Sequence, residues 1–204
     1  MRTVRASSLR SRSGRNVSSA DKHMKASSII CAVITLALCL ISGIRTAEAQ
    51  RSHDAVSAIR QRHATINQSL AKYKAIKKEL LGFSAEGGEL TVYTEGSALR
   101  KIVARFYGEM GRALEEYYYW DNELQFVYRK EDTYSEAMSG KVSSSVETRF
   151  YFEDDKLIRW LDRKGKPMRP GSEQFAEQEK KYLRNSQLFA AEARSGKATI
   201  EAPE

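Results

Sequence analysis

Between residues 88 and 161, apolar and aromatic side chains tend to recur at every second position, and short runs of glycine, serine, aspartate and asparagine interrupt the pattern. Such alternation is typical of half-buried β-strands, because successive side chains of a strand point to opposite faces. Turn-forming residues between these runs indicate hairpins. The pattern predicts strands over residues 90–94, 99–107, 114–120, 124–129, 142–152 and 157–161.

A helical spacing precedes this alternating region. Apolar side chains three and four residues apart run from Val56 to Leu80 and predict a helix over residues 53–81. His63 and Lys77 interrupt the apolar seam of this helix. The interruption favours packing on the chain's own sheet, while self-association through the seam is the alternative.

A second helical pattern follows the strands. Ser172 is placed to cap the start of this helix, and Gly196 is expected to end it. Residues 197–204 are expected to form a frayed tail. The apolar face of the predicted helix consists of Phe175, Tyr182, Leu183, Phe189 and Ala190.

These elements predict an α+β fold, a single antiparallel β-meander sheet of about five to six strands flanked by an N-terminal and a C-terminal α-helix. We expect residues 50–204 to form one domain, because a chain of this length can bury a substantial core. The predicted organisation is a secretory signal peptide with a long basic segment (1–49), an N-terminal amphipathic helix (50–87), the meander (88–169), and the C-terminal helix with its tail (170–204).

The signal peptide is predicted from an uncharged apolar segment, residues 29–44, that follows a basic stretch. The segment is too short for a membrane-spanning helix, which needs about 20 apolar residues. The small residues Ala47 and Ala49 then form an A-x-A cleavage site. We expect cleavage between Ala49 and Gln50, and a periplasmic or secreted location in a bacterium.

Removal of this leader changes the charge of the chain. The whole sequence has 34 Lys+Arg and 26 Asp+Glu, and residues 1–49 contain 8 of the basic and 2 of the acidic residues. The remaining chain therefore has 26 basic and 24 acidic residues, a net charge of +2. This balance argues against a nucleic-acid partner, which needs a basic surface, and we expect no membrane association after cleavage. Cys31 and Cys39 both lie in the leader, so no disulfide or thiolate metal site is expected. The long basic stretch leaves two candidate start residues, Met1 and Met24.

The densest aromatic run is residues 117–120. Strand alternation sends Tyr117 and Tyr119 to one face and Tyr118 and Trp120 to the other. One pair is expected to meet the core. The other pair either packs under a helix or forms an open surface on which a sugar ring or a peptide can stack. These four residues are the candidate ligand-binding residues.

Catalytic motifs are absent from the sequence. His53 and His63 are ten residues apart on one predicted helix, so they cannot share a metal ion, and no metal or cofactor is expected. No Gly-x-Ser-x-Gly motif or phosphate-binding loop occurs. The carboxylates Glu116, Asp121 and Glu147 are the candidates for a hydrolase without a recognisable motif.

Two neighbouring carboxylates behave differently from a catalytic pair. Glu115 and Glu116 are adjacent in a strand and therefore point to opposite faces. Glu147 and Arg149 share a face, and we expect them to form a surface ion network with Glu115.

These observations favour an exported, non-catalytic binding protein that uses an aromatic-rich sheet face. Its expected partner is an envelope protein, a peptide or a glycan. A carboxylate-dependent envelope hydrolase is the alternative.

Overall fold

The computed structural model describes residues 50–203. The predictions about the leader, its apolar segment and its start residue concern residues outside this range. Within it, no helix is both long and apolar enough to cross a bilayer.

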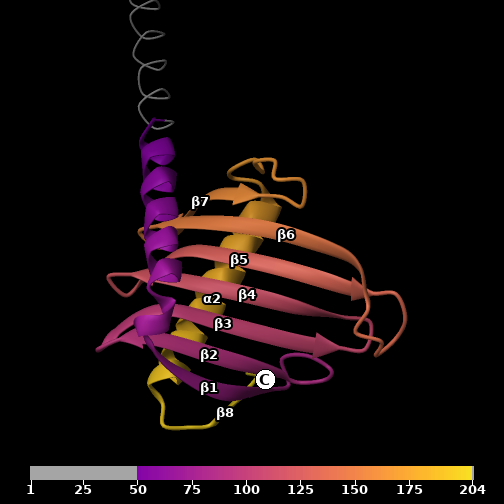
Figure 1. Ribbon diagram of the computed structural model, residues 1–204. Helices are drawn as coiled ribbons and strands as arrows, with labels where there is room; N and C mark the ends of the chain where they lie inside the picture. The colour runs from indigo at the N-terminus through magenta and orange to yellow at the C-terminus, as the bar shows by residue number, and fades with distance from the viewer. Residues whose placement is uncertain (1–49, 204) are drawn as a thin grey trace, which may run out of the picture. The chain divides into compact units, whose positions relative to one another are not determined.

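One eight-stranded sheet forms the centre of this part of the chain (Figure 1). Its strand order is β7-β6-β5-β4-β3-β2-β1-β8, and all neighbours are antiparallel except β1 and β8, which are parallel. The strands are β1 (Lys74–Leu81), β2 (Gly88–Glu95), β3 (Ala98–Gly108), β4 (Gly111–Trp120), β5 (Glu123–Tyr134), β6 (Val142–Glu153), β7 (Lys156–Leu161) and β8 (Thr199–Glu201). The predicted α+β class is confirmed, but the sheet is larger than predicted and it is mixed rather than antiparallel throughout.

The predicted first helix is too long. A helix occupies residues 50–68, the short 3₁₀ helix η1 spans Leu70–Lys72, and β1 follows. Tyr73, which caps η1, already has extended backbone angles, φ −86° and ψ 146°. β1 pairs with β2 along residues 74–80, and its last three residues, 79–81, also pair with β8, so these pairings satisfy many of its backbone groups. The apolar spacing of this segment resembles a helix, but long-range pairing overrides it.

The tail is also ordered differently from the prediction. Ser172 caps α2 (Glu173–Arg194) as predicted, accepting a hydrogen bond from the Phe175 amide at 3.3 Å. The helix ends one residue before Ser195 rather than at Gly196. The chain then returns as β8, which places the buried Ile200 opposite Leu80 of β1. Burial of this apolar side chain explains why the tail pairs instead of fraying.

Lys78 joins β1 to the C-terminal end of α2. Its side chain is buried, and Nζ donates to the carbonyl oxygens of Ser195 and Lys197, both at 2.7 Å. We expect Lys78→Met to lower the free energy of unfolding by about 2 kcal/mol, because two charge-assisted hydrogen bonds are lost while the stem stays packed. Urea unfolding measures the loss. Lys77→Met on the exposed side of the strand is the control, and equal losses in both variants would contradict this role.

The two helices lie on opposite faces of the sheet (Figure 1). On one face, α2 packs over the larger core, which includes Tyr117, Tyr119, Phe150, Tyr182 and Phe189. On the other face, the N-terminal helix packs over a smaller cluster. That cluster consists of Val56, Ile59 and Ile66 of the helix with Tyr118, Phe126, Tyr151 and Leu161 of the sheet.

The N-terminal helix covers only one end of its face of the sheet (Figure 1). The strand register places two cross-strand rows of side chains beyond the helix on this same face. We call these rows the open face. They consist of Glu89, Arg105, Leu114, Lys130 and Glu147 in one row, and Tyr107, Arg112, Asp132 and Ser145 in the next.

Candidate functional site

The aromatic run lies mostly in the core. Tyr117 and Tyr119 are 0% and 2% exposed under α2, where the Tyr119 hydroxyl lies 3.0 Å from Ser186 Oγ. Tyr118 is 1% exposed under the N-terminal helix. Strand alternation therefore separates the run as predicted, and both faces are covered at this point. Tyr117 and Tyr119 are therefore closed to a ligand in this arrangement, whereas Tyr118 borders a hollow of about 430 Å³ beside the N-terminal helix.

Trp120 is the one member of the run that is partly exposed. The guanidinium carbons of Arg62 and Arg100 lie 5.5 and 5.3 Å from the centroid of its ring. Cation–π contacts at such distances stabilise the ring position. Trp120 also lines a hollow of about 250 Å³ at the edge of the N-terminal helix, together with Arg62 and Asp121.

A polar network joins the N-terminal helix to the sheet. The Lys101 ammonium lies 2.9 Å from Glu116 Oε1, and the Tyr118 hydroxyl donates to Glu116 Oε2 at 2.6 Å. Asn67 of the helix accepts from Lys101 at 3.2 Å through Oδ1, which also lies 3.1 Å from the Tyr118 hydroxyl oxygen, and its amide nitrogen lies 3.0 Å from His63 Nε2. These bonds fix the end of the helix against the sheet.

His63 makes this junction sensitive to pH. Its ring stacks edge-on against Tyr118 and Phe126, with centroids 4.5 and 5.1 Å apart. Burial, followed by the positive charge of Lys101, lowers the pKa of His63, while Glu116 opposes this effect and Arg149 adds to it. The folded state therefore favours the neutral ring. The contribution of the neutral His63 ring to stability is complete above the pKa of about 6.5 that histidine has in the unfolded chain, and it is lost as the pH falls below that value.

We expect the wild-type protein to lose more thermal stability between pH 7.5 and pH 5.5 than His63→Gln does, because the variant has no imidazole to protonate. Differential scanning calorimetry at both pH values measures the two changes in Tm. Equal changes in both proteins would show that His63 does not titrate at this junction.

The carboxylates considered for hydrolysis are separated. Glu116 and Glu147 line the same hollow of about 430 Å³ on the open side of the N-terminal helix, whereas Asp121 lies in the β4–β5 turn. Glu116 is held by Lys101 and Tyr118, and Arg149 donates to Glu147 at 2.6 Å. Both carboxylates of the hollow are therefore already engaged.

Glu115 does not join Glu147 and Arg149 as expected. It points to the opposite face, where its side chain is 2% exposed and forms an ion pair with Arg129. The Tyr117 hydroxyl donates to the same carboxylate at 2.5 Å. The reason is the alternation of β4 and β6, which places Glu115 beneath α2 and Glu147 on the open face.

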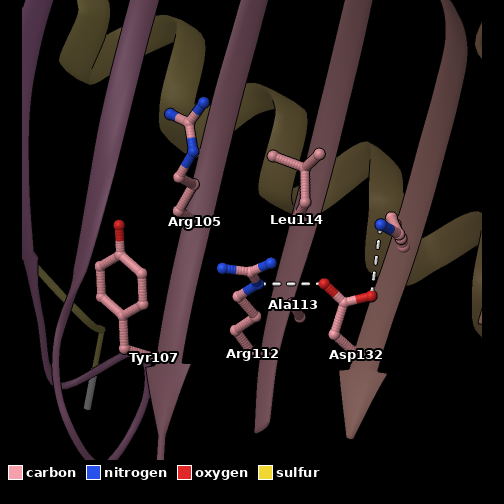
Figure 2. Close-up of a pocket in the computed structure, with 7 residues that line it drawn as sticks. Arg105, Tyr107, Arg112, Ala113, Leu114 and Asp132 are labelled. Carbon is pink, nitrogen blue, oxygen red and sulfur yellow. Dashed lines mark hydrogen bonds and ion pairs between the residues drawn. The ribbon is translucent and has the colours of Figure 1, made fainter. Parts of the chain in front are cut away.

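The open face has a hollow of about 330 Å³ at its centre (Figure 2). Arg105 and Tyr107 of β3, Arg112 and Leu114 of β4, and Lys130 and Asp132 of β5 line it. Arg112 and Asp132 are directly opposite in the register, and Arg112 Nε donates to Asp132 Oδ2 at 3.0 Å. Figure 2 shows the Arg112 side chain lying between Tyr107 and Asp132.

Asp132 organises this hollow. Its side chain is only 5% exposed, and it accepts a second hydrogen bond from Ser145 Oγ at 2.8 Å, while Lys130 Nζ lies 3.3 Å away. The hydrogen bonds from Ser145, Arg112 and Lys130 outweigh burial and lower the pKa of Asp132. Asp132 is therefore a fixed negative charge that holds Arg112 and Lys130 in place.

The predictions from the sequence do not include this hollow, although the register of the β3–β4 hairpin carries a signal for it. A turn centred between Gly108 and Gly111 places Tyr107 opposite Arg112 and Arg105 opposite Leu114, as the structure has them. The same reasoning cannot show how far the N-terminal helix extends over the face.

Comparisons with known proteins give no relative for this chain: no family model, no curated protein and no solved structure matches it. Within residues 50–203, no group of three or more His, Cys, Asp or Glu side chains is placed to hold a metal ion.

Proposed function

We propose that this chain is an exported, non-catalytic binding protein whose ligand surface is the open face. The observation that carries the proposal is the half-covered sheet. One helix occupies one end of the face and leaves a hollow of about 330 Å³, lined by fixed charges and a tyrosine, beside it. Concave sites with a few convergent polar groups are the usual places for ligands.

The partner belongs to the envelope or the surroundings of the cell, as an envelope protein, a peptide or a glycan. The apolar segment at residues 29–44 and the small residues before Gln50 support export. Fusing residues 1–49 to alkaline phosphatase tests it, because that reporter is active only outside the cytosol. We expect an active reporter and a mature N-terminus at Gln50; an inactive, uncleaved fusion would contradict export.

The open face can be tested with one introduced cysteine, because residues 50–204 contain none. We would replace Cys31 and Cys39 by alanine in the full chain and add Leu114→Cys, labelled with a benzophenone maleimide. We expect illumination in the envelope fraction of the native host to give a discrete adduct identifiable by mass spectrometry. Arg163→Cys, whose native side chain is 72% exposed on the loop after β7, is the control. The same adducts at both positions would contradict the proposal.

A carboxylate-dependent hydrolase is the second candidate, since Glu116 and Glu147 line one hollow. Their ion pairs with Lys101 and Arg149 favour a structural role. A panel of chromogenic esters and glycosides separates the two functions. If the wild type hydrolyses one of these substrates and Glu116→Gln abolishes the activity, the hydrolase function would be supported and the non-catalytic function contradicted.

A further inference from the structure

We infer that Arg105, Arg112 and Lys130, with Tyr107, form a pocket for a small ligand that carries an oxyanion, either a carboxylate or a phosphate. The inference rests on the proposed function, because it assigns a ligand chemistry to the open face. It depends on three features of the hollow: which donors are free, which charges are neutralised and how large the space is.

Arg112 has free donors. Its contact with Asp132 uses Nε, and within residues 50–203 no other hydrogen bond from its guanidinium is present. The terminal nitrogens therefore keep their N–H groups for a ligand. A guanidinium fixed through one nitrogen and open at the others is suited to a two-point contact with a carboxylate or phosphate.

Arg105 has no neutralising partner. Its strand neighbour on β4 is the apolar Leu114, and in the described part of the chain no carboxylate lies within 4.0 Å of its guanidinium. Glu89 is its neighbour on β2, but the Glu89 carboxylate interacts with Tyr107. The charge of Arg105 is thus available at the rim of the hollow.

The charges and size of the hollow select a small anion. Three cations and one carboxylate line it, and Asp132 is already occupied by Arg112, Lys130 and Ser145. Burial, the charge of Glu89 and a hydrogen bond to Glu89 raise the pKa of Tyr107, so its hydroxyl is engaged by Glu89 and its ring forms one wall of the hollow. A volume of about 330 Å³ is at the small end of ligand sites. Leu114 supplies an apolar floor for the carbon part of the ligand.

The test uses the protein recovered from expression of the full chain. Inorganic phosphate and succinate would be titrated at constant ionic strength, with chloride as the balancing salt, and followed by ¹⁵N–¹H NMR. We expect at least one of them to bind and to shift the amides of β3, β4 and β5 around the hollow. A response to phosphate alone or to succinate alone identifies which oxyanion the pocket prefers.

Arg105→Gln with Arg112→Gln is expected to raise the dissociation constant at least about tenfold, because two charge-assisted contacts are lost. Both side chains are exposed, so the fold should persist, which a thermal melt checks. Arg163→Gln with Lys164→Gln removes the same charge outside the hollow and should leave binding within about twofold.

Three results would overturn the pocket: no binding of either anion, equal weakening in both double variants, or shifts confined to other parts of the molecule. They do not have the same meaning for the proposed function. An adduct from Leu114→Cys without anion binding would support the open face as a binding surface and contradict the oxyanion ligand. Anion binding without any adduct would support the oxyanion pocket and contradict an envelope partner at the open face.

Discussion

Glu115→Leu is expected to lower the free energy of unfolding by about 3–5 kcal/mol, the largest effect of any substitution considered for this protein. The Glu115 side chain is 2% exposed and pairs with Arg129, whose side chain is 22% exposed. Leucine would leave the guanidinium with Glu131 alone, at the rim of the core. It would also remove the acceptor of the buried Tyr117 hydroxyl. Guanidinium chloride unfolding measures the change.

The same pair offers its own control. Glu115→Leu combined with Arg129→Leu removes both charges, and we expect this double variant to recover most of the loss, because hydrophobic replacements of buried ion pairs are often tolerated. Tyr117→Phe removes the hydroxyl but keeps the ion pair, and we expect it to lower the free energy of unfolding by about 1–3 kcal/mol. Losses that simply add in the double variant would mean that the two charges do not interact.

The hairpin region could be predicted because its signals are local. Asp121-Asn122 and Asp154-Asp155 lie between predicted strands, where turn-forming residues indicate hairpins, and all four residues have positive φ, between 50° and 64°. Two successive residues in this conformation match the right-handed twist of the flanking strands, and aspartate and asparagine tolerate it. Strand alternation between such turns gives the face of many side chains, but a register shift in β5 places Leu124 and Phe126, two residues apart, on opposite faces.

The end of the sheet formed by β1 and β8 could not be predicted, because these two strands pair across more than a hundred residues of sequence. β1 forms where Leu80 meets Gly88 on one side and Ile200 on the other. The apolar spacing of residues 74–81 does not predict either of these pairings, because it fits a helix as well as it fits a strand. β8 is only three residues long, and a short segment of this kind gives no pattern of its own.

The site divides in the same way. The separation of Tyr117 and Tyr119 from Tyr118 and Trp120 follows from alternation alone. Whether an aromatic face is open depends on where a helix lies across it, and here Ile59 and Ile66 of the N-terminal helix help to cover Tyr118. The charged part of the same face stays open because no apolar helix residue would gain by covering it.

Gly111→Ala is expected to lower the free energy of unfolding by about 3 kcal/mol, because the new methyl group would collide with backbone. A Cβ at Gly111 would lie 2.3 Å from the carbonyl oxygen of Asp132 on β5. That oxygen cannot move aside easily, since β5 is held between β4 and β6. Urea unfolding measures the loss, and the shift of Asp132 should also weaken phosphate or succinate binding through its contact with Arg112.

Gly108→Ala is the matched control, on the other side of the same turn. Its Cβ would lie 3.5 Å from the Gly111 carbonyl oxygen, an ordinary contact, and we expect a change within about 1 kcal/mol. If Gly111→Ala were as stable as Gly108→Ala, the close approach of β4 and β5 at Asp132 would be disproved. If Gly111→Ala unfolded easily but bound anions as tightly as the wild type, the strand contact would stand, and Asp132 would not be what positions Arg112 for a ligand.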